Sequence, residues 1–419
     1  MTYDEIARYV FLFPTALVYY PIRRRLIHRH FSRRSFVRVS VLQENLAKGL
    51  SIVGRAVASR STLPVLNNIL LETEHSQLKL SAMDMEIAVN CWVGAMIEEE
   101  GQITVPARLL GDFVNSLPKE RIDMELNART QTLHLRCAHY EANIKGIDAN
   151  EFPIIPTYQG DMEDPSVEVE PAKLRSMIDQ AAFAASKDDS RPTFTGVYTL
   201  LEGDRLTMVA TDGFRLAVRS AILEEPVAAN LGVIIPARAL TELSRIISAV
   251  DLSEDDGVEV IFTQARNQIM FHLPGVDLVS QLIEANFPDY KKIIPTSYNT
   301  RAVLDTGEFL NAMKVADLFA RDAARSVKVT LEPGDRGKVI LTATSPELGD
   351  NVSEIDAMIE GEGMHATFNS KYMIDVLQVI DTPQVAFEAV SATRPGVFRP
   401  VGGSPEDDYV HVIMPMSPR

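Results

Sequence analysis

The chain contains few of the residues that carry redox, metal or covalent chemistry. Its 419 residues include only two cysteines, Cys91 and Cys137, and one tryptophan. The cysteines form no CxxC pair, so by themselves they cannot build a disulfide framework or a zinc site, and such sparse use fits a reducing cytoplasm. The motifs GxxxxGKS/T, HExxH, GxSxG and a strand-borne GxGxxG are absent as well. We therefore expect no catalytic residue, no metal and no cofactor.

The sequence also lacks an apolar run long enough to cross a bilayer. Residues 9–22 are apolar, but they include two prolines and fall short of the roughly 20 residues that a span needs. Basic residues follow this run at 23–36, whereas a secretory signal has them in front. We expect residues 1–36 to be a poorly ordered extension, or upstream sequence ahead of a true start at Val37. A membrane-surface anchor is the alternative.

Positive charge is in short supply. The formal net charge is −16, and because residues 1–36 carry seven arginines against two carboxylates, the remainder carries −21. Taken as a sum, this charge argues against nucleic acid, since phosphate binding needs Lys and Arg. A net charge does not report where the charges lie, however, so their distribution has to decide.

The chain does contain one plan repeated three times. Residues 103–118, ITVPARLLGDFVNSLP, match residues 233–248, VIIPARALTELSRIIS, as a short strand, Pro-Ala-Arg and an amphipathic helix. Pro106 and Pro236 suit the first helical turn, where the missing N–H is harmless. A weaker third copy is HATFNSKYMIDVLQVI at 365–380, and the copies are offset by 130 and 134 residues.

Two further markers keep the same period. A second helix is predicted at 43–58, 171–186 and 306–322, and a hairpin marker at 78–89 is echoed at 206–218 and 339–350. Repeats of this length indicate a triplicated domain, because solenoid repeats span only about 20–50 residues. We predict an α+β fold with three similar domains at 37–158, 165–290 and 291–419, each with several strands and two helices.

The stretch LTMVATDGFRLAVRS, residues 206–220, contains an unusual corner. Two runs of strand formers meet at Asp212-Gly213, which favours a tight hairpin because both central residues can take φ > 0. Thr211, Phe214 and Arg215 crowd this turn, although a solvated hairpin needs neither an aromatic ring nor a guanidinium. Asp212 already has a role in the turn, so we assign it no catalytic role.

The repeated VPAR helix, TDGFRLA, FPDYKKIIP and the terminal VIMPM together resemble the bacterial sliding clamp family, the beta subunit of DNA polymerase III. The resemblance covers about residues 37–419, with the motifs in the same order and spacing. It implies the DNA clamp fold, with two helices and antiparallel sheets in each of three domains. It also implies a cytoplasmic, non-catalytic processivity factor, a ring-shaped head-to-tail homodimer whose helices line a hole for duplex DNA.

The charge distribution fits a ring on DNA. The six helix segments sum to +2, which leaves −23 on the rest of the body. A weak, screened field allows sliding, whereas strong phosphate contacts would hold a ring in place. The alternative is that these cations only solvate amphipathic helices. With the resemblance, we expect DNA-facing side chains at Arg60, Arg108 and Arg238, with Lys48, Arg55, Lys173, Arg175 and Arg245 as secondary candidates.

In the family, the DGxRL corner and the C-terminal strand form two walls of a hydrophobic cleft. DNA polymerase III alpha, clamp loader subunits, other polymerases and repair proteins insert a short linear motif there. Methionine is flexible enough to fit different peptides, and Arg and Lys can hold oxygens. Phe194 and Phe214 are expected departures that reshape the pocket. The implied cleft residues are Arg191, Phe194, Thr211, Gly213, Phe214, Arg215, Leu216, Pro288, Lys292, Ile293, Val412, Ile413, Met414, Pro415 and Met416.

Family geometry also implies that the first domain of one subunit meets the third domain of the other, with unpaired strand edges at both ends. We expect Ile144 on one side and Leu318 and Phe319 on the other. Two rivals remain open: a clamp-like peptide-docking scaffold without a replicative role, and an α+β enzyme with a site between repeats. The lack of a nucleophile, metal or cofactor motif weighs against the enzyme.

Overall fold

The computed structural model describes residues 36–58, 61–127, 129–160, 164–224, 230–263, 267–403 and 408–416. The chain folds into two compact units. Of the described residues, the first unit contains those up to 160 together with Pro274–Val279, and the second contains those between 164 and 273 and those from Ser280 to Met416. The extension that we expected at 1–36 lies outside the described residues, except for Phe36, which begins the first strand.

The first unit packs two antiparallel sheets and two helices. One sheet has the order β5-β1-β7-β8-β9, and the other contains β17-β4-β3-β2-β6. Helices α2 and α3 are Gln43–Val53 and Ala107–Ser116. The strands are β1 Phe36–Leu42, β2 Asn68–Glu74, β3 Gln77–Met83, β4 Ile87–Gly94, β5 Met96–Glu99, β6 Gln102–Pro106, β7 Arg121–Asn127, β8 Thr132–Cys137, β9 Tyr140–Lys145 and β17 Val276–Gln281.

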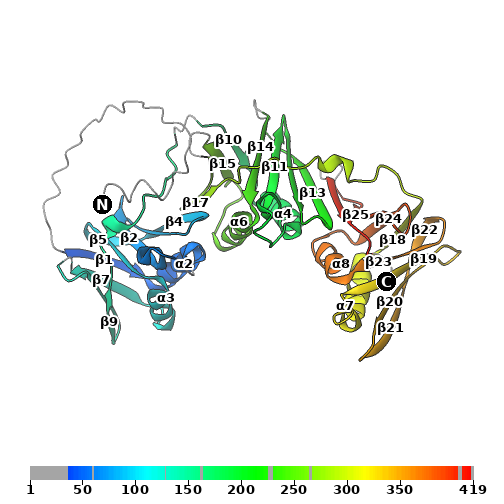
Figure 1. Ribbon diagram of the computed structural model, residues 1–419. Helices are drawn as coiled ribbons and strands as arrows, with labels where there is room; N and C mark the ends of the chain where they lie inside the picture. The colour runs from blue at the N-terminus through cyan, green and yellow to red at the C-terminus, as the bar shows by residue number, and fades with distance from the viewer. Residues whose placement is uncertain are drawn as a thin grey trace. The chain divides into compact units, whose positions relative to one another are not determined.

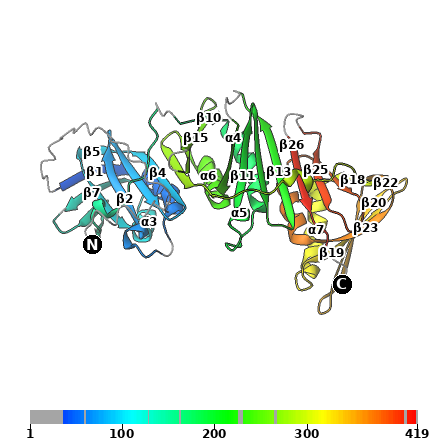
Figure 2. The same ribbon diagram turned by 45° about the horizontal axis from the view of Figure 1, so that its top comes forward.

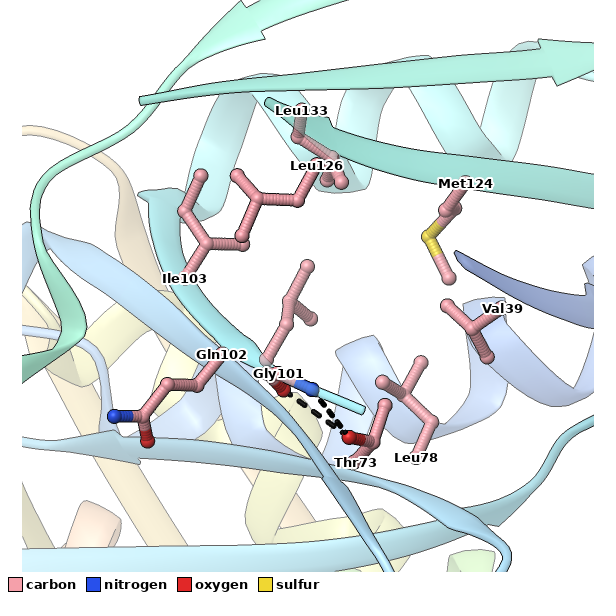
Figure 3. Close-up of a pocket in the computed structure, with 10 residues that line it drawn as sticks. Val39, Thr73, Leu78, Gly101, Gln102, Ile103, Met124, Leu126 and Leu133 are labelled. Carbon is pink, nitrogen blue, oxygen red and sulfur yellow. Dashed lines mark hydrogen bonds between the residues drawn. The ribbon is translucent and has the colours of Figure 1, made fainter. Parts of the chain in front are cut away.

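The core of the first unit lies between its two sheets. A small cavity of about 20 Å³ remains there, and Figure 3 shows its lining of apolar side chains. Val39, Met124 and Leu133 come from one sheet and Leu78 and Ile103 from the other. At its rim, the Thr73 hydroxyl accepts from the Gly101 N–H at 2.8 Å. The lining is mostly apolar, and the Thr73 hydroxyl is engaged by Gly101, so the cavity is a small packing gap between the apolar faces of the two sheets.

The second unit is built round a nine-stranded antiparallel sheet that runs through the second and third repeats, with the order β14-β11-β12-β13-β26-β25-β24-β18-β22 (Figures 1 and 2). Its strands are β11 Gly196–Glu202, β12 Arg205–Thr211, β13 Arg215–Ile222, β14 Leu231–Pro236, β18 Thr300–Asp305, β22 Met358–Gly361, β24 Gln384–Ala389, β25 Gly396–Val401 and β26 Asp408–Ile413.

The sheet is continuous because β13 pairs with β26, in a register that sets Leu216 opposite Val412. The second repeat adds β10-β15-β16, and the third adds a four-stranded sheet, β21-β20-β19-β23. These strands are β10 Ser166–Val169, β15 Val258–Thr263, β16 Gln268–Leu273, β19 Ser326–Glu332, β20 Lys338–Ser345, β21 Gly349–Asp356 and β23 Met364–Asn369. The helices are α4 Pro171–Ala181, α5 Pro192–Thr195, α6 Ala237–Ala249, α7 Thr306–Ala320 and α8 Ser370–Leu377.

The six predicted helices are confirmed as three packed pairs: α2 with α3, α4 with α6, and α7 with α8. Polar side chains tie the first two pairs. Gln43 Nε2 donates to the Val114 carbonyl at 2.8 Å, and the Ser244 hydroxyl donates to Asp179 at 2.7 Å. Pro106 and Pro236 lie one position earlier than expected. They cap α3 and α6, and the helices begin at the following alanines, because each proline also ends a strand.

The three hairpin markers form the same corner. In each, one oxygen accepts from the backbone N–H groups two and three residues ahead. Asp84 accepts from Glu86 and Ile87, and Asp212 accepts from Phe214 and Arg215. In the third repeat, the Ser345 hydroxyl accepts from Glu347 and Leu348. Turns of this kind favour Asp and Ser, because their short side chains place an oxygen within reach of the following backbone N–H groups.

Candidate functional site

The corner between β12 and β13 is the first part of the candidate site. Gly213 has φ 92°, a conformation that only glycine adopts readily. Asp212, in contrast, is not among the described residues with positive φ. The prediction of two left-handed central residues is therefore wrong. The Asp212 carboxylate closes the turn by accepting hydrogen bonds from two backbone N–H groups. A left-handed backbone at Asp212 is therefore unnecessary.

The Arg215 guanidinium is directed into the protein, and its side chain is only 9% exposed. Its Nε donates to Asp212 Oδ2 at 3.0 Å, and its Nη2 donates to the Phe183 carbonyl at 2.7 Å. Its Nη1 donates at 2.7 Å to Asp375 Oδ2, on helix α8 of the third repeat. Arg215 thus joins β13 to a helix 160 residues further along the chain.

Aromatic rings extend this contact into a column. The Tyr372 ring lies 4.6 Å and the Phe183 ring 5.3 Å from the guanidinium carbon of Arg215. The His411 ring stacks on Phe183 at 5.3 Å. Burial, together with the positive Arg215, lowers the pKa of His411 to about 3. His411 is therefore neutral at neutral pH, so the column holds one cation among rings, a favourable arrangement for a guanidinium.

A pocket of about 440 Å³ opens beside the corner. Arg191 lines it, donating from Nη1 to the Asp212 carbonyl at 3.0 Å and from Nε to Asp188 at 3.3 Å. Hydrogen bonds from Ser190, with a smaller effect of Arg191, lower the pKa of Asp188. The remaining lining is formed by Ala185, Ser186, Lys187, Phe214, Arg215 and Tyr372.

The C-terminal tail forms the second part of the site. After β26, the Met414 N–H donates to the Phe214 carbonyl at 2.8 Å, and the Met416 N–H donates to the Thr367 carbonyl at 2.8 Å. The tail therefore runs from the corner to β23. Met414 is exposed, and Pro415 and Met416 are half-buried. Met414 is therefore accessible at the surface, unlike a core methionine.

The segment 287–294 forms the third part of the site. It covers the face of the nine-stranded sheet that lies opposite to Arg215. Tyr290 is buried against Leu216 and Val412, with Phe287 and Ile294 packed beside them. Successive residues of a strand face opposite sides. Leu216 and Val412 therefore lie on one face of the sheet, while Arg215 lies on the other.

The predicted cleft residues thus fall into groups that differ in access. The structure exposes Gly213, Phe214, Pro288, Lys292, Ile293 and Met414. It leaves Arg191, Phe194, Pro415 and Met416 half-buried, and the Arg215 side chain is 9% exposed. The buried members, which support the walls from within, are Thr211, Leu216, Val412 and Ile413.

Sequence reasoning missed several residues at this site. Phe183, Lys187, Tyr372 and Asp375 all lie at the corner. The spacing of Tyr372 and Asp375 on α8, three residues apart, places them on one helix face, which was a usable signal. Nothing in the sequence, however, connects that face to Arg215.

The predicted DNA-facing residues differ in place and access, and two of them, Arg108 and Arg238, are exposed at helix starts. Arg60 lies outside the described residues. Arg108 is 96% exposed with Asp112 at 3.7 Å, and Arg238 is exposed at the start of α6. Arg175 and Arg245 have half-exposed side chains on α4 and α6, while Lys48 and Arg55 are half-buried. Lys173 donates to the Ile222 carbonyl at 3.3 Å, so its ammonium is directed at β13, which weakens it as a candidate.

The predicted interface residues differ in access. Leu318 is 51% exposed on α7 and Phe319 is half-buried beside it. Ile144 is buried within the first unit, so its side chain is not available to a partner. It lies on β9, the edge strand of its sheet, and β21 is an edge strand of the third repeat. An interface at these edges would use backbone groups in place of the Ile144 side chain.

Other chemistry is sparse among the described residues. They contain no group of three or more His, Cys, Asp or Glu residues able to hold a metal ion. Burial raises the pKa of Cys91 to about 12, which keeps this thiol protonated and unreactive. No helix in the described ranges is long and apolar enough to cross a membrane.

The comparisons with known proteins agree along the chain. The DNA polymerase III beta subunit family matches through its N-terminal domain at residues 37–156, its central domain at 168–289 and its C-terminal domain at 291–417. A beta sliding clamp of Staphylococcus aureus is 33% identical over 371 residues, covering 86% of this chain and 94% of the relative.

Solved structures give the same result. The DNA polymerase sliding clamp of Bacillus subtilis has a TM-score of 0.83 and 29% identity, covering 92% of this chain and all of that one. The DNA polymerase III subunit beta of Pseudomonas aeruginosa, solved bound to griselimycin, has a TM-score of 0.81 and 29% identity, covering 91% of this chain and all of that one.

Proposed function

Since the chain belongs to the DNA polymerase III beta subunit family, we propose which of its residues perform the work of a sliding clamp. The protein has the DNA clamp fold and is a non-catalytic DNA replication factor. As a homodimeric ring it encircles duplex DNA without regard to sequence, and it tethers DNA polymerase III and other partners. Processivity comes from topological closure, so no reacting group is needed.

We assign the work to three clamp domains, 37–158, 165–290 and 291–419. Each contains a helix pair and one of the repeated corners. We place the protein in the cytoplasm, where its DNA template lies and where its two cysteines stay reduced.

The partner cleft lies at the Phe214 corner and the tail. One observation carries this assignment: the backbone hydrogen bond from Met414 to Phe214 brings two exposed apolar side chains together at the corner. Met414 and Phe214 can bury Leu and Phe side chains of a linear motif. The polymerase III alpha subunit, clamp loader subunits and repair proteins carrying such a motif would compete for this cleft.

DNA faces the helix pairs, with Arg108 and Arg238 as the leading described contacts. Both arginines lie at helix starts on exposed surface. Sequence-independent phosphate contacts of this kind weaken steeply with salt. The dimer joins the β9 edge of one subunit to the third domain of the other, with Leu318 and Phe319 as apolar contacts.

The decisive test is loading onto circular DNA by the cognate clamp loader. The protein should stay on the circle through gel filtration and should be lost after a restriction enzyme linearises the DNA. Retention that survives linearisation would show ordinary binding and would contradict encirclement. Peptide docking without any retention would instead favour the scaffold alternative.

A further inference from the structure

We propose that Arg215 and Asp375 form a latch that positions the partner cleft, and that the Arg215 guanidinium does not bind the partner. This inference rests on the proposed docking function and assigns Arg215 a different role within it. In this role Arg215 is a positioning residue: it fixes the corner of the second repeat against helix α8 of the third.

The first argument is the inventory of donors. Each of the three guanidinium nitrogens of Arg215 already donates to a protein oxygen, at 2.7–3.0 Å. The group also lies near two aromatic rings, Tyr372 and Phe183. These hydrogen bonds use three of the five N–H groups and hold the guanidinium in one orientation, and with the side chain only 9% exposed the two remaining N–H groups offer a partner carboxylate little access.

The second argument comes from the two other corners. Asp84 and Ser345 close their turns by accepting the same pair of hydrogen bonds from backbone N–H groups. The residues three positions ahead of them are Ile87 and Leu348. The turn itself therefore needs no cation at the position of Arg215. What distinguishes the second corner is its contact with α8, which the Arg215–Asp375 pair supplies.

The third argument is burial. The Arg215 side chain is 9% exposed and that of Asp375 is 14% exposed. Removing one member breaks the ion pair between the corner and α8. The other charge then keeps only the partner on its own side of that contact, Asp212 for Arg215 or Lys371 for Asp375, which favours opening of the contact to water. Opening would move Phe214, which is the neighbour of Arg215 and holds Met414 through its carbonyl. The latch therefore reaches both walls of the cleft.

Asp375 has a second partner that supplies a matched control. Lys371 Nζ donates to Asp375 Oδ1 at 2.5 Å, and the Lys371 side chain is 55% exposed. Lys371→Gln removes the other cation that pairs with the Asp375 carboxylate but leaves Arg215 in place. Because exposed pairs of this kind contribute little, this variant should behave like the parent.

The experiment titrates two fluorescein-labelled peptides against the full-length dimer. Both carry an N-terminal Gln and a Leu-Phe end, one as the free acid and one as the C-terminal amide. We expect Asp375→Asn and Arg215→Gln each to weaken both peptides about tenfold and equally. The double variant should be no weaker than either single one, and Lys371→Gln should bind within about twofold of the parent.

The outcomes separate the possibilities. If Arg215→Gln weakens only the acid peptide, Arg215 binds the partner directly and the latch is wrong. If the parent binds but Asp375→Asn matches it, the latch is also wrong. A parent that binds neither peptide would instead overturn the proposed cleft.

Hydrogen exchange tests the latch without any peptide. The amides of Phe214 and Arg215 should exchange faster in Asp375→Asn than in Lys371→Gln. Equal protection in the two variants would contradict the latch, and melting temperatures identify any variant that fails to fold.

Discussion

At the scale of single residues, His411 shows how burial sets ionisation. Neither ring nitrogen of His411 has a hydrogen-bond partner among the described residues, and burial lowers its pKa from 6.5 to about 3. The unfolded chain therefore binds a proton between these two values that the folded chain does not. Stability from this group is full above about pH 6.5 and is lost as the pH falls toward 3.

We predict a measurable pH effect from this one ring. Between pH 6 and pH 4, His411 should cost the parent up to about 1.4 kcal/mol of unfolding free energy per pH unit. His411→Phe keeps a ring against Phe183 but cannot take up the proton. Its melting temperature should fall less on acidification than that of the parent. Parallel curves for the two proteins would mean that His411 is protonated in the folded state.

The DNA contacts are also a residue-scale question. We predict that Arg60→Ala with Arg108→Ala and Arg238→Ala weakens open-ring binding to DNA. The slope against salt should fall by about one for each phosphate that an arginine no longer neutralises. Arg136→Ala is the control, because Arg136 is exposed on strand β8, away from the helix starts. An unchanged slope in the triple variant would show that these side chains do not meet phosphates.

At the scale of elements, the cleft has two walls, the corner at Phe214 and the C-terminal tail. Phe214 is 60% exposed, so Phe214→Ala should cost little stability while weakening a fluorescent Leu-Phe peptide about tenfold. Removing residues 414–419 should abolish binding and leave the dimer mass unchanged. Met85→Ala is the matched control at the corresponding corner of the first repeat, where Met85 is 70% exposed. Full binding by the truncated protein would place docking elsewhere.

Helix α7 carries the prediction about assembly. Leu318→Ala with Phe319→Ala should give monomers at micromolar concentration by light scattering, because both side chains would be fully buried only in the ring. Leu109→Ala, which is similarly exposed on α3, controls for a general effect of removing surface leucines. A dimer mass for the double variant would move the interface away from α7.

The repeats explain how far sequence reasoning could go at this scale. The helices at 43–58, 171–186 and 306–322 were predictable because apolar spacing and period agree, and the three corners were predictable because Asp or Ser recurs at the turn. The φ of Asp212 was not predictable, because the turn is closed by hydrogen bonds to its side chain, whereas we expected its backbone conformation to form the turn. The bond from Arg215 to Asp375 was not either, because a contact 160 residues apart leaves no local pattern.

At the scale of the whole molecule, the most direct question concerns the N-terminal residues. Residues 1–36 precede the first repeat and have no counterpart in the other two. We predict that a chain beginning at Val37 forms dimers and is loaded onto circular DNA as the full chain is. Folded dimers that cannot be loaded would assign a function to residues 1–36.

The pairing of β13 with β26 has a consequence for biosynthesis. A ribosome completes β13 long before it reaches β26, yet Arg215 must pair with Ile413. During translation the second repeat therefore emerges with an open strand edge, which stays vulnerable to aggregation until the third repeat has been made. The same order acts as a check on quality: a nascent chain that stops early never closes this edge and never completes the cleft that partners would bind.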